Sequence, residues 1–206
     1  MGGQGHIDVA QDVRPCATTA LRLARRTFVA GDRIDAQALA ASLGVDRTTL
    51  FRWVGNRDRL LVSVLTSLAD PTLRDAAAAA GGTGPERIGR IVRLFAQALI
   101  DAPYYRAFLR RETERALRLI TTKASPLQQH VVASFERLLE QERDRGHLDP
   151  ALDLHDLAYL VVRIAESFIY ADLITGDPPD AGKAELAIAA LLRGSERTRD
   201  PDHRSP

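Results

Sequence analysis

The sequence predicts an all-α protein with about nine helices. Apolar residues recur three and four positions apart over most of the 206-residue chain, which is the period of an amphipathic helix. No segment alternates apolar and polar residues as a half-buried strand does. Hydrophobic residues make up 45% of the composition, which is ordinary for a globular protein and sufficient for a core.

The first two helices are expected to be short and sharply ended. Pro15 suits the first turn of a helix, and Gly31 ends the apolar run that follows it. Asp35 is a favourable N-cap for the next helix, over residues 36–43. Gly44 then supplies the tight turn that ends this second helix.

Two further helices follow directly. Asp46 can cap a third helix over about residues 46–53, and Asn56 can cap a longer fourth helix that starts near Arg57. Pro71 interrupts this fourth pattern, because a proline inside a helix removes a backbone hydrogen bond.

A glycine-rich break separates these helices from the rest of the chain. Gly81, Gly82, Gly84 and Pro85 mark a connection between helices and not a phosphate-binding loop, because no Gly-Lys-Ser/Thr closes it and no strand precedes it. The helical period then resumes. Helices are expected from Pro85 to about Leu99, from Pro103, from Ser125-Pro126 to Gly146, over 154–173 and over 181–193.

The second and third helices have the pattern of a helix-turn-helix. Ala40 is a small residue where the two helices cross, and Gly44 makes the turn between them. Leu50 and Val54, four positions apart, bury one face of the third helix and leave the other free to enter the major groove of DNA. The side chains expected to face the groove are Arg47, Thr48, Thr49, Arg52 and Trp53.

These residue types suit DNA recognition. Arginine grips guanine through two hydrogen bonds, and threonine offers a hydroxyl or meets a thymine methyl group. Arg57 is expected to hold a phosphate, together with the amino end of the helix that it begins. Residues 1–60 hold nine arginines and six acidic residues, whereas the rest of the chain is slightly acidic. A basic front joined to an acidic back fits a nucleic-acid module followed by a second domain.

The stretch "IDAQALAASLGVDRTTLFRWVGNRDRLL", residues 34–61, resembles the DNA-binding segment of the TetR family of bacterial transcription regulators. Gly44, Val45, Leu50 and Leu60 match the family pattern in order and spacing. The later segment "RIAESFIYADLITGDPPD" is similar to a subgroup related to regulators of quorum-signal degradation.

The sequence departs from the family pattern at several positions. Phe51 stands where the family has a tyrosine whose hydroxyl meets a DNA phosphate, so that contact is lost. Trp53 replaces the usual histidine and Val54 the usual phenylalanine. Asp46 replaces the usual capping serine, which places an anion near the DNA backbone, and Arg57 replaces the usual lysine with its charge retained.

The resemblance implies a cytoplasmic homodimeric repressor that binds a palindromic double-stranded DNA operator and is released by a small-molecule effector. The lone Cys16, and the absence of a leader peptide or a membrane-spanning run, fit that location. The expected organisation is a mobile arm over 1–14, a helix-turn-helix DNA-binding domain over 15–62, a ligand-binding and dimerisation domain over 63–193, and a disordered tail over 194–206.

The resemblance also implies an effector pocket in the second domain. Arg163 and Glu166 lie three positions apart in an apolar helix. They form a structural ion pair near a subunit interface, contact a polar ligand group, or are exposed at the surface. Aromatic residues at helical spacing form either plain core or a pocket lining. The predicted pocket residues are Phe95, Leu99, Tyr104, Tyr105, Phe108, Phe135, Tyr159, Arg163 and Glu166.

The resemblance also implies that the last two helices form the dimer interface. The helix over 154–173 is apolar almost all round, so it needs a second partner beyond its own domain. Small side chains on the final helix would allow close approach of a neighbouring helix. The predicted interface residues are Ala184, Ala187, Ile188 and Leu191.

No signature of catalysis or of a bound cofactor is expected. The acids and histidines over residues 147–156 resemble metal ligands, but Asp153 and Asp156 suit helix capping and no His-Glu-x-x-His pair is present. No Gly-x-Ser-x-Gly elbow occurs. The alternative to a DNA-binding regulator is a helical ligand-binding or scaffolding protein with a non-functional helix-turn-helix, which Phe51 and Asp46 favour.

Overall fold

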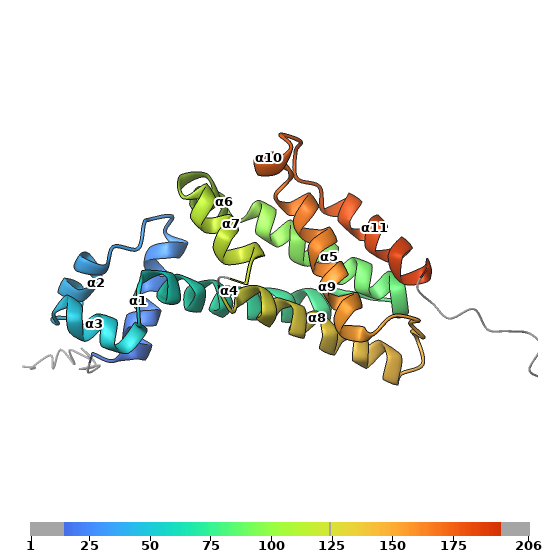
Figure 1. Cartoon of the computed structure of the whole chain (residues 1–206), viewed down its shortest axis with the longest axis horizontal. Helices are drawn as coiled ribbons and strands as arrows, with labels where there is room; N and C mark the ends of the chain where they lie inside the picture. The colour runs from blue at the N-terminus through green and yellow to red at the C-terminus, as the bar shows by residue number, and fades with distance from the viewer. Residues whose placement is uncertain (1–14, 124, 195–206) are drawn as a thin grey trace, which may run out of the picture.

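The computed structural model describes residues 15–123 and 125–194, so the expected arm over 1–14 and nearly all of the expected tail lie outside the described residues. The described residues form eleven helices and no strand, which confirms the all-α prediction (Figure 1). The helices are α1 (Ala17–Val29), α2 (Ala36–Ser42), α3 (Arg47–Val54), α4 (Arg57–Ala79), α5 (Gly84–Asp101), α6 (Pro103–Arg111), α7 (Thr113–Thr121), α8 (Leu127–Asp144), α9 (Leu154–Ile169), α10 (Ala171–Ile174) and α11 (Ala181–Gly194).

The capping residues predicted for the first helices are confirmed. The Asp35 carboxylate accepts from the Ala38 amide at 2.8 Å, and the Asp46 carboxylate accepts from the Thr49 amide at 2.7 Å. Asn56 caps α4 in the same way, through the Arg59 amide. Each contact satisfies a backbone donor that a helix terminus would otherwise leave unpaired.

Helix α4 does not end at Pro71, and the predicted interruption was wrong. The helix continues to Ala79 with Pro71 inside it. A proline inside a helix removes one hydrogen bond, but packing of α4 against α5 and α8 holds the helix together on both sides of it. As a result, α4 is a single rod that begins beside α3 and extends under the second half of the molecule (Figure 1).

Two helices expected to be continuous are each divided. Glu112 separates α6 from α7 with a backbone that is not helical, φ −132° and ψ 46°. Tyr170 separates α9 from α10, so the helix predicted over 154–173 ends at Ile169. The Arg106 guanidinium donates to the Ile169 carbonyl at 3.3 Å, which satisfies a carbonyl that the break leaves free.

The molecule is elongated, with α1, α2 and α3 at one end and α4 leading from them to the remaining helices (Figure 1). Helix α11 lies along α5 and α9. The contact with α5 is close at Gly89, where a methyl group would lie 3.1 Å from the Glu185 carbonyl oxygen. Among the described residues, no helix combines the length and the apolar character needed to cross a membrane.

Candidate nucleic-acid interface and ligand cavity

Helix α3 presents one polar, basic face to solvent. Arg47, Thr48 and Arg52 are exposed, whereas Leu50 on the opposite face is fully buried. The Arg47 guanidinium lies 5.0 Å from the centre of the Phe51 ring, a cation–π contact that orients it. The exposure of these three polar side chains agrees with the prediction from the sequence, and the buried Leu50 side chain anchors the helix that carries them.

Two of the predicted groove residues are less free than expected. The Thr49 hydroxyl donates to the Asp46 carboxylate at 3.0 Å and is half-buried. The hydrogen bonds that the Thr49 amide and hydroxyl donate hold the pKa of the Asp46 carboxyl below its usual range. This carboxylate therefore stays ionised beside the helix terminus. Trp53 is half-buried against the core and borders an open groove between α1, α4 and α7. Its ring therefore packs at the side of α3 and not on its most exposed face.

Arg57, which is predicted to hold a DNA phosphate, is engaged inside the chain in this structure. Its Nε donates to the Ile34 carbonyl at 2.9 Å. Its Nη1 and Nη2 donate to the two carboxylate oxygens of Glu112, at 2.8 and 2.6 Å. No local pattern in the sequence indicates this pair, because the partners are 55 positions apart.

An ion network surrounds this pair and links the helix-turn-helix end to the corner between α6 and α7. Arg115 contacts Glu112 at 3.0 Å and Asp58 at 3.3 Å, and Arg118 contacts Asp58 at 2.8 Å. We call this set the corner network; its members are Arg33, Arg57, Asp58, Glu112, Arg115 and Arg118.

A largely apolar cavity of about 80 Å³ lies between α4, α5, α6, α8 and α9. Six of the nine predicted pocket residues line it: Phe95, Leu99, Tyr104, Tyr105, Phe135 and Glu166. Sequence reasoning missed the wall that α4 supplies through Leu65, Leu68 and Thr72, and it missed Gln128 and Tyr170. The apolar spacing of α4 was visible in the sequence, but nothing local showed which helices it would face.

Three predicted pocket residues lie outside this cavity. Phe108 is buried against Phe28 of α1, with ring centres 5.4 Å apart. Tyr159 is 47% exposed on the outer face of α9. Arg163 lies on the same outer face and reaches back to the Glu166 carboxylate at 2.5 Å and to the Thr121 carbonyl at 3.1 Å. The helical period placed all three on apolar helices but did not show which face each helix turned to the cavity.

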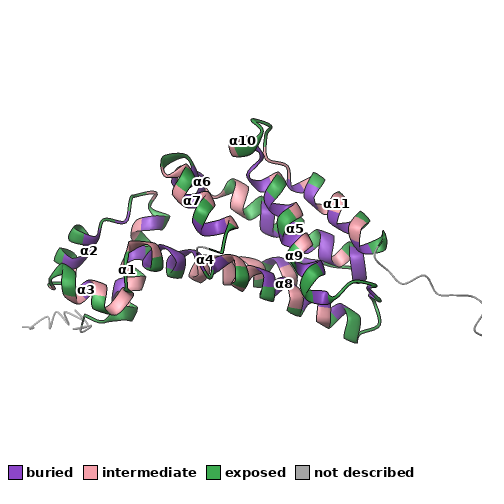
Figure 2. Cartoon of the chain, viewed as in Figure 1, coloured by how far each residue is buried: buried purple, intermediate pink, exposed green. Residues whose placement is uncertain are grey.

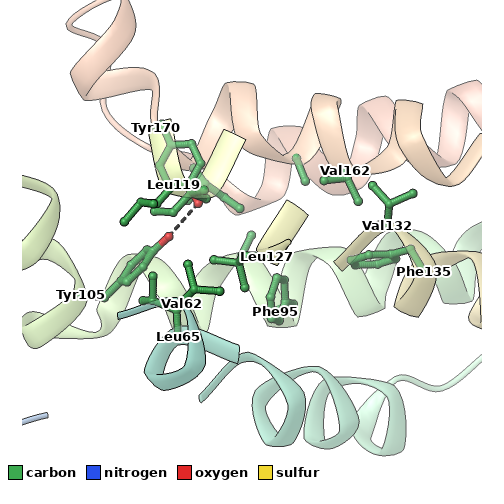
Figure 3. Close-up of a cluster of buried hydrophobic side chains, with 14 of the residues drawn as sticks. Val62, Leu65, Phe95, Tyr105, Leu119, Leu127, Val132, Phe135, Val162 and Tyr170 are labelled. Atoms are coloured by element: carbon green, nitrogen blue, oxygen red, sulfur yellow. Dashed lines mark hydrogen bonds between the residues drawn. The ribbon is translucent and has the colours of Figure 1, made fainter. Parts of the chain in front are cut away.

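Two tyrosines close one end of the cavity. The hydroxyls of Tyr105 and Tyr170 point toward one another and lie 2.7 Å apart (Figure 3). Burial raises the pKa of both phenols above the usual value, so both remain protonated. Burial also raises the pKa of Glu166 to about 7, although the Arg163 guanidinium acts in the opposite direction.

The residues predicted for a dimer interface do not all face outward. Ala184 and Ile188 are buried inside the chain, where α11 packs on α5 and α9. Ala187 and Leu191 are only half-buried, and the neighbouring Leu186 is 69% exposed. Figure 2 shows this mixture of buried and exposed positions along α11. The expectation for Ala184 and Ile188 is corrected, because close packing within the chain already uses the small-residue face.

The acids and histidines over residues 147–156 do not converge. The His147 ring lies against Glu142 at 3.3 Å, whereas the His155 ring lies against Glu136 at 3.0 Å. Asp153 caps the start of α9 through the His155 amide. Within the described ranges, no three histidine, cysteine or acidic side chains are grouped to hold a metal ion.

A helix-turn-helix joined by a long helix to an all-α body with an internal cavity is an architecture typical of transcription regulators. Residues 83–193 match the family model for the tetracyclin repressor-like C-terminal domain. The chain belongs to the TetR family of transcriptional regulators.

Solved structures of the family superpose on this chain. The transcriptional repressor QsdR from R. erythropolis is 30% identical, with a TM-score of 0.80 over 89% of this chain and 97% of that one. AlkX from Dietzia sp. strain DQ12-45-1b is 22% identical, with a TM-score of 0.58 over 87% and 96%. FadR from Bacillus subtilis, solved with stearoyl-CoA, is 11% identical, with a TM-score of 0.55 over 87% and 99%. The last two show a shared fold alone. Among curated proteins, no sequence matches this chain.

Proposed function

We propose that this protein is a dimeric, ligand-responsive repressor that binds a palindromic operator in the cytoplasm. The observation that carries the proposal is the exposed face of α3, where Arg47, Thr48 and Arg52 project from a helix anchored by Leu50. A recognition helix needs such a rigid polar face to read bases in the major groove. The similarity to the repressor QsdR supports the same role.

The proposed dimer forms through the outer faces of α9 and α11. Tyr159, Ile164 and Phe168 of α9 and Leu186 and Leu191 of α11 are apolar and not fully buried in the single chain. Because the two helices lie side by side, these residues provide a surface for a second copy. We expect Leu186→Arg to give a monomer in light scattering, while Val29→Arg, at the distant end of α1, leaves the dimer intact. A dimeric Leu186→Arg variant would assign the interface elsewhere.

The proposed effector site is the apolar cavity, and two features can carry its state to the DNA-binding end. Helix α4 forms one wall of the cavity and begins directly after α3. Tyr104 lines the cavity and also packs edge-on against Phe28 of α1, with ring centres 5.8 Å apart. A ligand that moves either wall changes how the two recognition helices of a dimer are spaced, provided that it binds the DNA-free arrangement more tightly.

The test is fluorescence anisotropy of the purified protein with the DNA upstream of its own gene, beside unrelated DNA of equal length and at two salt concentrations. We expect a preference of about 10³ or more for the operator and affinity that falls steeply with salt. Arg47→Ala and Arg52→Ala should each cost about 1–3 kcal/mol on the operator, while Arg143→Ala, at the end of α8, changes nothing. Failure to bind any DNA at low salt would favour a ligand-binding or scaffolding protein instead.

A further inference from the structure

We infer that the cavity takes an uncharged, mainly apolar small molecule that carries an oxygen able to accept a hydrogen bond from Gln128. The inference deepens the proposed function, because it rests on the cavity being the effector site, and it names the class of effector. It draws on the charge of the lining, on a buried donor without a partner and on the size of the cavity.

The lining contains no cation. Its residues include Glu166 and the protonated tyrosines Tyr105 and Tyr170, but no lysine, arginine or histidine. An anionic ligand would therefore enter an apolar space with no counter-ion, which is strongly unfavourable. The guanidinium bonded to Glu166 belongs to Arg163, which lies on the outer face of α9 and also donates to the Thr121 carbonyl.

A cationic ligand is also poorly served. Glu166 is the single carboxylate of the lining, and Arg163 already occupies it. Burial further favours the protonated form of this carboxyl, since its pKa is raised to about 7. A ligand amine would have to displace the Arg163 guanidinium from Glu166 and also keep the Glu166 carboxyl ionised. A neutral ligand has neither requirement.

The lining offers a hydrogen-bond donor that no described residue uses. The Gln128 Nε2 atom is buried and has no partner among the described residues. A buried N–H group without an acceptor is unfavourable, and a ligand oxygen placed against it removes that cost. The Tyr105–Tyr170 pair provides a second donor. One of the two hydroxyls accepts the hydrogen bond between them, and its own proton can then be donated to a ligand oxygen. The polar part of the cavity is therefore matched to a carbonyl, ester or ether oxygen.

The cavity limits the apolar part of the ligand to a compact group. Its volume of about 80 Å³ is smaller than the ~150 Å³ cavity that holds benzene in an apolar protein core. A ligand of greater bulk must push the walls apart, and two of those walls are α4 and Tyr104. Binding and displacement of the DNA-binding end are thereby linked in one event.

The test uses three probes of similar length, hexan-2-one, hexanoate and hexylammonium, titrated into the full-length protein by calorimetry at about pH 6, where the acid and the amine are both charged. We expect hexan-2-one to bind with a Kd at least about tenfold below the other two. Gln128→Leu should weaken hexan-2-one about three- to tenfold, as expected for one lost hydrogen bond. Gln129→Leu, at the adjacent exposed position, is the matched control, and thermal melts verify that both variants are folded.

Equal or tighter binding of hexanoate or hexylammonium would overturn the inference, as would an unchanged hexan-2-one affinity in Gln128→Leu, or no binding of any probe. Operator anisotropy with and without hexan-2-one separates the two levels of the proposal. Binding of hexan-2-one without release of DNA would leave the ligand class standing and contradict the effector function. If the protein binds its operator but prefers the charged probes, the proposed DNA-binding function stands and the ligand class is contradicted.

Discussion

Arg57 binds both carboxylate oxygens of Glu112, with Nη1 2.8 Å from Oε2 and Nη2 2.6 Å from Oε1. The two side chains are mostly buried, at 17% and 13% exposure. Arg57 begins α4, and Glu112 is the residue that separates α6 from α7. The Nε–H of Arg57 donates to the carbonyl of Ile34, just before α2. One guanidinium thus joins the helix-turn-helix to the rest of the chain, and its planar fork suits this bidentate task better than an ammonium would.

Removal of the Glu112 charge should destabilise the whole chain. Glu112→Gln leaves the largely buried Arg57 without its counter-ion, and we expect a loss of about 1–3 kcal/mol in the free energy of unfolding. Urea denaturation measures it, with Glu114→Gln, an exposed position two residues further on in the first turn of α7, as the control. Equal unfolding midpoints for the two variants would mean that the pair contributes no net stability.

The role of Arg57 in DNA binding can be separated from its role in the fold. If Arg57 stays bound to Glu112 in the complex, Arg57→Ala weakens operator binding without changing its dependence on salt. A phosphate contact would instead reduce the slope of log K against log salt by about one. Anisotropy titrations across a salt series decide between the two, and Arg47→Ala provides the comparison within α3.

Tyr104 should matter more for coupling than for stability. Its edge-on contact with Phe28 is worth about 0.5–1.5 kcal/mol. We expect Tyr104→Leu to retain operator binding and cavity binding of hexan-2-one but to lose most of the release of DNA by that probe. Tyr104→Phe keeps the ring and should behave as the wild type. Full release in Tyr104→Leu would assign the coupling to α4 alone.

The tyrosine pair gives a double-mutant test. Tyr105→Phe or Tyr170→Phe alone leaves one buried hydroxyl without its partner, at a cost of about 1–3 kcal/mol. The double variant removes both hydroxyls and should recover most of that stability in urea denaturation. Additive losses in the double variant would show that the two hydroxyls do not depend on one another.

Glu166 should make stability depend on pH in a defined direction. Its pKa is about 7 in the folded chain against the usual 4.5, chiefly because of burial. The folded state therefore binds the proton more tightly than the unfolded state. The contribution of Glu166 is most favourable below about pH 4.5, falls as the pH rises to about 7, and above that is lower by about 3 kcal/mol.

Glu166→Gln should remove this slope and be more stable than the wild type above neutral pH. The measurement is the difference in unfolding free energy between the two proteins across the pH range, which cancels the titration of all other groups. Glu114→Gln should show no such difference. A wild-type curve parallel to that of Glu166→Gln would mean that Arg163 holds the carboxyl ionised in the folded state.

Much of the fold could be predicted because the signals are local. The Asp35, Asp46 and Asn56 caps each bind an amide three positions ahead, and Gly44 takes the positive φ of 66° that its turn needs. The burial of Leu50 opposite the exposed Arg47 follows from the helical period alone. These features need no knowledge of distant segments, so the helix-turn-helix geometry could be predicted together with the exposure of Arg47, Thr48 and Arg52 on α3.

The sequence by itself determined the helices, their caps and the polar face of α3, whereas tertiary structure decided what each helix faces. In the packed structure, α4 continues through Pro71, and α9 ends before α10 at Tyr170. Tyr159 and Arg163 lie outside the cavity lining. Tertiary structure also engaged Arg57 with a residue 55 positions away and left Gln128 as a donor in the cavity wall. The physical reason is range: hydrogen bonds within one helical turn are encoded by adjacent residues, but ion pairs and cavities arise only when distant helices pack together.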